Sequence, residues 1–423
     1  MKEDPDSIKP VIDHLFRQEA GKLVAVLTKI FGPRNLELAE DVVQDTLLKA
    51  LEHWKFRGVP DNPAAWLFTA ARNKALDVLR RERHKKEFAE DLSALLKSEY
   101  SVGSTLNQLI SETEIQDEQL RMMFVCCHPS IAEEGQVALI LKTLCGFSVA
   151  EIAKAFLTNE DTITKRLYRA REQFRHENIR FEIPHPKDLP IRLNSVLTAV
   201  YLLFNEGYNS SNHDFLIRED LVEESIRLTH LMAGHPVTGT PPTLALLSLL
   251  CFHAARLYSR VDKDRHFISL QHQDRSLWNQ ELIKRGMLFL NQASFGDDMS
   301  TYHIEASIAY EHCIAKDYAS TNWKSILQLY DWLYHLKPGA MVALNRAIVI
   351  AEVEGAEAGL TALEQIHGAN SLRNYYLLPA TRGELFFRLG DFRQAKQNLE
   401  KAIEMTASPV EKEYLKTKIS QMI

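Results

Sequence analysis

The 423-residue sequence contains little cysteine and no long apolar run. Its cysteines are odd in number and lie mostly in apolar surroundings, which favours reduced structural thiols over a disulfide framework; they are Cys126, Cys127, Cys145, Cys251 and Cys313. No stretch of about 18 apolar residues occurs, so we expect no membrane-spanning helix. The polar start MKEDPDSIKP lacks the basic and apolar regions of a signal peptide. We therefore expect a cytoplasmic protein.

The sequence also lacks the patterns of common enzymes and metal sites. It contains no nucleophile elbow, P-loop, dinucleotide fingerprint or HExxH. Histidines such as His253, His303 and His312 are scattered, and we interpret most of them as structural. Cys126-Cys127-His128 has no CxxC or second histidine pair nearby, whereas a closed zinc site needs four ligands. We expect no catalysis, no metal and no cofactor.

An overall excess of positive charge is absent too, but two short stretches are strongly basic. The formal net charge is −6. Residues 72–86 hold seven Lys or Arg against two acidic residues, a net of +5, and residues 162–180 hold six against two, a net of +4. Local rather than global basicity is typical of proteins that bind nucleic acid. The alternative is that these are two solvated helix faces.

Nearly every segment has the three- and four-residue apolar spacing of helices, which predicts an all-α protein. Proline and glycine fall mainly between these segments. We predict a helical module at 8–86, a polar flexible linker at 87–113 and a second module at 114–178. Three prolines mark a linker at 179–190, because each disfavours helix at the residue before it. A further helical body is expected at 191–423.

The first module contains two helices that matter for function. In Leu38–Trp54 we expect an apolar face of Val42, Thr46, Leu47, Ala50, Leu51 and Trp54, with Glu40, Asp41, Gln44, Asp45 and Lys49 outward. The next helix begins with Asn62 as N-cap and Pro63 at the first position, and its core face is Leu67, Ala71, Leu76 and Leu79. Another surface combines an exposed aromatic, amides and arginines: Trp66, Thr69, Arg72, Asn73, Asp77, Arg80 and Arg81. Such a surface suits single-stranded DNA, whose unstacked bases it can read.

The second module has the pattern of a helix-turn-helix. Ser148-Val-Ala-Glu151 is a capping box that opens a helix. A short turn at 157–159 leads into a strongly basic second helix, and Ile152, Ala153 and Phe156 are expected to pack on Ile163, Leu167 and Ala170. Such a helix can enter the major groove. The candidate contacts are Thr162, Thr164, Lys165, Arg166 and Arg169. The alternative is a plain helical hairpin.

These two modules resemble one known family. AEDVVQDTLLKAL and NPAAWLFTAARNKALDVLRRERHK resemble region 2 of the extracytoplasmic-function sigma factors of the sigma-70 family. GFSVAEIAKAFLTNEDTITKRLYRAREQF resembles region 4, with Leu157 where the family often has Gly. The resemblance implies that Asp41, Gln44 and Asp45 dock on core RNA polymerase. It also implies that the loop 55–63 and the helix 66–81 read the melted −10 element, with Asn73 near a flipped-out base.

By the same resemblance, the second module reads the −35 duplex, and the linker 87–113 threads the polymerase between the two promoter contacts. No third sigma domain is visible in the sequence. An alternative of a different class is a stand-alone regulator that binds duplex DNA through the helix-turn-helix and senses a ligand with its C-terminal body. The module around Trp66–Arg81 discriminates between the two, because a protein that binds only duplex DNA does not need to read a melted strand.

The C-terminal body contains a repeat pattern. Gly383, Phe386, Leu389, Ala395, Leu399 and Ala402 match the small and large positions of a tetratricopeptide (TPR) repeat, and a weaker copy lies 36 residues earlier. Stacked helical repeats bind partners rather than catalyse, which leaves a protein or a ligand open as partner. Residues 191–318 show no clear repeat, but 201–211 and 274–283 are polar-aromatic clusters. They form either a pocket, a contact with the first two modules, or buried polar networks at helix ends. The arrangement resembles the sigma subgroup with a long TPR-like C-terminal extension, which implies regulation by that extension.

Overall fold

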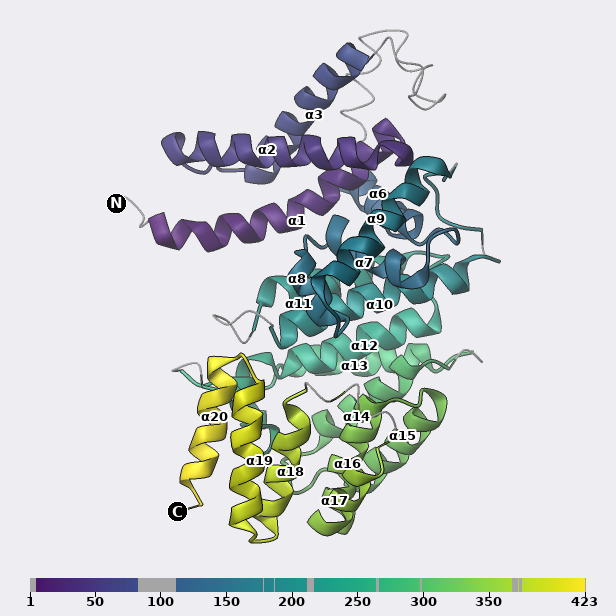
Figure 1. Ribbon diagram of the computed structural model, residues 1–423. Coiled ribbons are helices and arrows are strands. Elements are labelled where there is room, and N and C mark those ends of the chain that lie inside the picture. The colour runs from purple at the N-terminus through teal and green to yellow at the C-terminus, as the bar shows by residue number, and fades with distance from the viewer. Residues whose placement is uncertain are drawn as a thin grey trace. The chain divides into compact units, whose positions relative to one another are not determined.

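The computed structural model describes residues 5–82, 112–177, 179–185, 187–210, 217–263, 266–296, 299–366, 372 and 375–422. Within these ranges all regular secondary structure is helical, apart from an isolated β-bridge between Val261 and Phe267 (Figure 1). The predicted all-α class is therefore confirmed. The predicted linker lies outside the described residues except for its last two positions, which belong to a helix. The chain divides into two compact units, residues 1–203 and 204–423.

The N-terminal unit is built from eight helices in its described part, the last of which continues into the next unit. They are α1 (Pro5–Phe31), α2 (Leu36–Arg57), α3 (Pro63–Glu82), α6 (Glu112–Cys126), α7 (Glu133–Thr143), α8 (Val149–Ala155), α9 (Glu160–His176) and α10 (Leu189–Tyr208). A short 3-10 turn, η1 (Pro33–Asn35), links α1 to α2. The division between units falls inside α10, beyond the proline-rich segment at which the sequence suggested it.

Two buried helices hold the N-terminal unit together. α1 packs on α2, α3 and α6, while α7 packs on α6, α8 and α9. Almost the whole of α7 is buried, as expected for its apolar sequence. Gly21 of α1 makes a close approach possible, because a Cβ there would lie 2.2 Å from the Leu144 carbonyl oxygen. The helices of both predicted modules thus share one core.

The C-terminal unit centres on α12 (Pro241–Ala255), which is buried on nearly every side. It packs against α11 (Glu219–Gly234), α13 (Gln280–Ala293) and α14 (Thr301–Ile314). Short 3-10 turns cover Leu257–Arg260, Leu270–His272 and Arg275–Leu277. Gly286 of α13 lets α12 come close, since a Cβ there would lie 2.6 Å from the ring of Phe252.

The remaining helices pack pairwise along the chain. They are α15 (Trp323–Leu336), α16 (Ala340–Glu354), α17 (Ala356–Glu364), α18 (Leu377–Arg388), α19 (Phe392–Met405) and α20 (Pro409–Ser420). Figure 1 shows α18, α19 and α20 side by side, in agreement with their contacts. Gly383 meets Leu399, and Gly359 meets Ala351, at the small positions of the predicted repeats. The assignment to the TPR family itself stays a prediction.

Four of the five cysteines are buried. All five cysteines are unpaired, and burial raises the pKa of the Cys126 and Cys127 thiols, which keeps both protonated. Among the described residues, no group of three His, Cys, Asp or Glu side chains is arranged to hold a metal ion. None of the helices in the described part of the chain has the length and apolarity needed to cross a bilayer.

Candidate nucleic-acid interface

The outer face of α2 combines acidic, amide and apolar side chains. Asp41, Gln44 and Asp45 are exposed as predicted. Leu48 is 59% exposed and Leu51 44% exposed, so the expectation that Leu51 lies in the core is wrong. These five residues follow a helical spacing of three and four, and we call them the α2 outer face. The sequence interpretation missed Leu48, although it lies four residues after Gln44.

The opposite side of α2 packs into the core, which leaves the α2 outer face exposed to solvent. Val42, Thr46, Ala50 and Trp54 are buried, and the Trp54 ring lies 5.5 Å from that of Phe16. The helix ends at Arg57 and is capped by Gly58, whose φ of +79° favours glycine. Just before this end the Phe56 side chain is 83% exposed. Phe56 lies within the predicted loop 55–63, whose first three residues belong to α2 and whose last begins α3. It is a candidate base-stacking group that the sequence interpretation did not name.

α3 begins as predicted, because the Asn62 Oδ1 accepts a hydrogen bond from the Ala65 amide at 3.0 Å. Leu67, Ala71 and Leu79 are buried, but Ala75 takes the core position that was expected for Leu76, which is only half-buried. The helical period locates a face to within about one residue, which accounts for this difference.

The opposite surface of α3 is open to solvent at most of the predicted positions, namely Thr69, Asn73, Asp77, Arg80 and Arg81. Arg72 is half-buried and donates to the Asn73 Oδ1 at 3.1 Å. Trp66 differs from the expected exposed aromatic, because its ring is half-buried and lies 5.5 Å from both Trp54 and His53. Contact with Trp54 explains why Trp66 is held against the helix pair.

The helix-turn-helix forms at α8 and α9, and the predicted capping box is present. The Ser148–Glu151 capping box is complete, and the Asn159 Oδ1 accepts from the Thr162 amide at 2.9 Å. Ile152, Ala153, Ile163, Leu167 and Ala170 are buried between the helices and α7. Leu157 has φ of +51°, the left-handed conformation that disfavours every residue except glycine. This is why glycine suits that position of the turn.

The N-terminal half of α9 presents an exposed strip made of Thr164, Lys165, Tyr168 and Arg169, which we call the α9 outer strip. Tyr168 is 64% exposed and was not predicted. Two predicted contacts are partly engaged elsewhere. Arg166 pairs with Glu134 at 2.5 Å and lies over the Phe156 ring, and the Thr162 hydroxyl donates to Asn159 at 2.9 Å.

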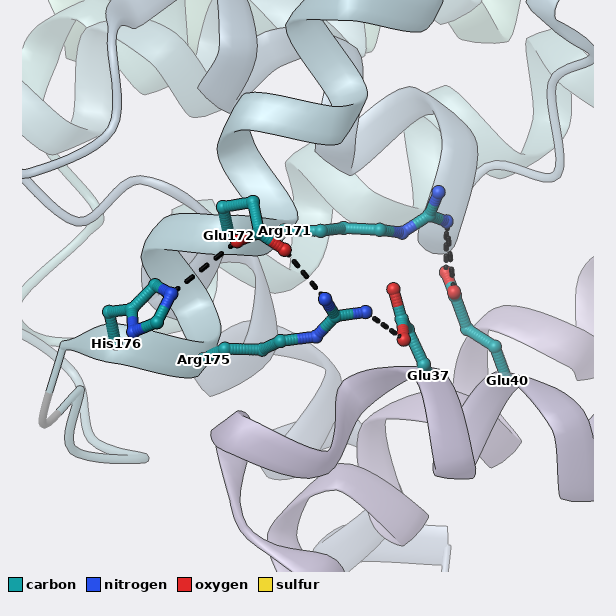
Figure 2. Close-up of polar contacts among 6 residues, drawn as sticks. All are labelled: Glu37, Glu40, Arg171, Glu172, Arg175 and His176. Atoms are coloured by element: carbon teal, nitrogen blue, oxygen red, sulfur yellow. Dashed lines mark hydrogen bonds and ion pairs between the residues drawn. The ribbon is translucent and has the colours of Figure 1, made fainter.

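The C-terminal half of α9 is neutralised by carboxylates of α2. Figure 2 shows Arg171 reaching Glu40, and Arg175 lying between Glu37 and Glu172. The Arg171 Nη2 donates to the two Glu40 oxygens at 2.9 and 3.1 Å, and the Thr143 hydroxyl donates to the same carboxylate at 3.0 Å. The hydrogen bond with Glu37 raises the pKa of Arg175. The basic stretch 162–180 is therefore not a uniform phosphate-facing surface.

Comparison with known proteins agrees with this division into modules. Residues 15–85 match the family described as Sigma-70 region 2, and residues 121–174 match Sigma-70, region 4. Residues 192–294 match a family of unknown function, DUF6596.

One relative matches most of the chain, and two others match less than half of it. An uncharacterized protein of Rhizobium meliloti is 33% identical over 389 residues, 92% of this chain and 91% of that protein. The ECF RNA polymerase sigma factor SigL of Mycobacterium tuberculosis is 31% identical over 133 residues, 31% of this chain and 70% of that protein. The ECF RNA polymerase sigma-E factor of Haemophilus influenzae is 27% identical over 172 residues, 40% of this chain and 88% of that protein. No solved structure matches the chain.

Proposed function

The chain belongs to the extracytoplasmic-function sigma factors of the sigma-70 family, and from this premise we propose how its surfaces direct transcription initiation. It is an RNA polymerase sigma factor, and its partners are core RNA polymerase and promoter DNA. The observation that carries the proposal is the presence of two different modules, the α2–α3 pair and the α8–α9 helix-turn-helix, in one chain. A stand-alone regulator of duplex DNA would need only the second.

We assign core polymerase binding to the α2 outer face. Leu48 and Leu51 supply apolar area that is lost from water on contact, which favours binding. Asp41, Gln44 and Asp45 supply polar complementarity around them. Asp45 also pairs with Lys74 of α3 at 2.8 Å, but both groups are about half exposed, so this pair contributes little to stability.

We assign the melted −10 element to the loop 55–63 and to the open side of α3. Phe56 and Trp66 are the aromatic groups, and Thr69, Asn73 and Asp77 the polar groups, that face the strand; Arg72, Arg80 and Arg81 hold its phosphates. We assign the −35 duplex to the α9 outer strip and Thr162, with Arg166 in a secondary position because of its pairing with Glu134.

The experiment that tests the proposal is in vitro transcription with bacterial core RNA polymerase on a library of duplex templates. We expect transcripts that depend on the added chain, and a Leu48→Asp variant whose affinity for the core enzyme falls at least about tenfold. Ile191→Asp is the matched control, because Ile191 is also an exposed aliphatic residue of the N-terminal unit. The proposal would be contradicted if the chain supported no transcription from any template and did not bind the core enzyme.

We propose further that the C-terminal unit regulates initiation. The test compares the full chain with a chain that ends at residue 210. An earlier cut at residue 190 would remove Val196, Ala199 and Val200, which are fully buried side chains of the N-terminal unit. We expect transcription from one template to change several-fold in either direction, and an unchanged transcript level at all chain concentrations would contradict regulation.

A further inference from the structure

Polar and aromatic side chains gather where α10, α12 and α14 end. The ring of Tyr208, the last residue of α10, lies 5.3 Å from that of His253 in the last turn of α12. The guanidinium groups of Arg260 and Arg256 lie 3.8 and 5.6 Å from the centre of the same Tyr208 ring. Both polar-aromatic segments singled out in the sequence contribute, since 201–211 contains Tyr208 and 274–283 contains Arg275. We define the Arg256 cluster as Tyr208, His253, Arg256, Arg260, Arg275 and His312.

Two of the three arginines in this cluster are explained by the fold. Arg260 donates to the Tyr208 carbonyl oxygen and so binds the end of α10. Arg275 donates to the His312 and Ala315 carbonyl oxygens at 2.6 and 2.9 Å, and to the Thr321 hydroxyl at 3.0 Å, and so binds the end of α14. Cations at helix C-termini satisfy free carbonyl groups and oppose the helix dipole.

Arg256 has no such explanation. It follows the last residue of α12, is half-buried, and its side chain has no hydrogen-bond or ion-pair partner among the described residues. Several nearby polar atoms also lack a hydrogen-bond partner among the described residues. The buried side-chain atoms without a partner in the described part of this region are the Tyr208 hydroxyl, the Nδ1 atoms of His253 and His312, Arg256 Nε and Trp278 Nε1. A buried polar group without a partner costs free energy, so several together require a ligand, an ion or water.

The electrostatics of the cluster indicate the sign of that ligand. Burial first, and then the neighbouring Arg256 and Arg275, lower the pKa of His312 to about 3. Burial, Arg256, Arg260 and His312 lower the pKa of His253 well below its ordinary value. Burial first, and also the neighbouring Arg256, lower the pKa of Arg260 and of Arg275, while Glu411 acts in the opposite direction on Arg260 and Asp317 on Arg275. The cluster therefore brings guanidinium groups close together, and every unpaired atom named above belongs to a group that can donate a hydrogen bond.

We propose that the Arg256 cluster binds the phosphate or carboxylate group of a small anionic molecule. A guanidinium group binds either group through two parallel hydrogen bonds, and the neighbouring phenol and imidazole groups can also donate hydrogen bonds. Tyr208, His253, Arg256 and His312 are half-buried as whole residues, while their unpaired atoms are themselves buried. An anion bound to these atoms would therefore be largely shielded from solvent. The site lies in the unit to which we assign regulation. Its effect on transcription rests on that proposed function, whereas binding does not.

The experiment measures anion binding to the full chain without polymerase or DNA, so its outcome is independent of sigma activity. Calorimetric titrations use inorganic phosphate, pyrophosphate and citrate as probes, at constant pH and at an ionic strength held constant with sodium chloride. We expect saturable binding of one anion per chain by at least one probe, at about millimolar concentration or below. Comparison of pyrophosphate with citrate distinguishes a phosphate ligand from a carboxylate ligand. No saturable binding by any probe would overturn the proposal.

Arg256→Gln separates a binding role from a structural one. We expect its anion affinity to fall at least about tenfold, while its melting temperature without anion equals or exceeds that of the wild type, because an unpaired cation is removed. Arg285→Gln is the matched control, since Arg285 is an exposed arginine of α13 paired only locally with Glu281; its anion affinity should be unchanged. If Arg256→Gln fails to fold, melts well below the wild type or binds anion equally well, the proposal is wrong.

Tyr208→Phe gives a second and milder test, because it keeps the ring against which Arg256 and Arg260 pack and removes only the unpaired hydroxyl. We expect anion affinity to fall about threefold or more with no loss of melting temperature. A lower melting temperature with full anion affinity would show that the hydroxyl serves the fold, and would count against the site.

Discussion

Helix α9 of the N-terminal unit and the Arg256 cluster of the C-terminal unit hold their positive charge in opposite ways. In the N-terminal unit, the cations of α9 lie on the helix surface, either open to solvent or paired with carboxylates of α2 and α7. In the C-terminal unit, Arg256, Arg260 and Arg275 lie among aromatic rings and helix ends, away from full solvation. Surface charge suits a long polyanion, whereas partly buried charge suits a small anion. The difference therefore separates a DNA-binding surface from a candidate ligand site.

Among the substitutions that change a surface or a contact, the largest expected effect comes from removing the open cations of α9. Lys165→Ala combined with Arg169→Ala should weaken binding to −35 duplex DNA by about 2–4 kcal/mol, or roughly 30- to 1000-fold, because each residue contributes a phosphate or base contact. Fluorescence anisotropy at fixed salt measures this. Arg175→Gln is the control, since that residue already pairs with Glu37 and Glu172. Equal losses for the two variants would remove the distinction between open and paired cations.

The next largest effect is expected in the C-terminal unit, where Arg275 binds a helix end and Arg256 does not. Arg275→Gln should destabilise the end of α14 by about 2–3 kcal/mol, because it leaves two carbonyl oxygens and one hydroxyl without their charged donor. Amide hydrogen exchange in the last turns of α14 reports this local stability. Unchanged protection there would mean that Arg275 does not hold the helix end, and the contrast with Arg256 would disappear.

Acid should affect the C-terminal unit through its buried histidines. His312 has a pKa lowered to about 3, and that of His253 is also well below its ordinary value. In the unfolded chain both have a pKa of about 6.5, so below that pH the unfolded state binds protons that the folded state does not. Stability is therefore complete above about pH 6.5 and is lost as the pH falls below it, down to about pH 3 for His312, by at most about 1.4 kcal/mol per pH unit for each histidine.

Urea unfolding of the C-terminal unit at several pH values measures this slope, and His312→Gln should reduce it by about half. The N-terminal unit provides the internal comparison, because His128 is its described histidine with a lowered pKa and remains partly open to solvent. A slope that is the same in wild type and variant would contradict the assignment.

The smallest expected effect lies in the turn of the helix-turn-helix. Leu157→Gly should stabilise the N-terminal unit by about 0.5–1 kcal/mol, because relief of the left-handed conformation outweighs the greater freedom of glycine in the unfolded chain. The Leu157 side chain is largely exposed, so little burial is lost. Denaturant unfolding measures the change. Leu157→Ala should give no such gain, and equal stabilisation by both variants would show that backbone strain is not the cause.

Much of the N-terminal unit follows from local sequence rules. The Asn62 cap and the Ser148–Glu151 capping box depend on residues three positions apart, so the sequence predicts where α3 and α8 begin. The Asn159 cap of α9 has the same spacing but was not predicted. Core positions follow from helical spacing. The boundary of a face is less certain, which is why Leu51 was wrongly placed inside and Leu48 was overlooked.

Contacts between distant segments could not be predicted in the same way. Glu40 and Arg171 lie 131 residues apart, and neither has a local pattern that indicates the other. The Arg256 cluster likewise combines residues from 208 to 312, each of which is unremarkable in its own helix. Its polar-aromatic segments were noticed in the sequence, but their convergence depends on how α10, α12 and α14 end together.

The pairing of Glu37 and Glu40 with α9 has a practical consequence for work with fragments. A fragment of residues 112–177 would carry Arg171 and Arg175 without these two glutamates. Up to two further guanidinium groups would then displace counterions from DNA, and the logarithm of affinity would fall with the logarithm of salt concentration more steeply by up to about 1.8. Non-specific affinity measured on such a fragment would therefore exceed that of the intact protein at low ionic strength, and the excess would shrink as salt is added.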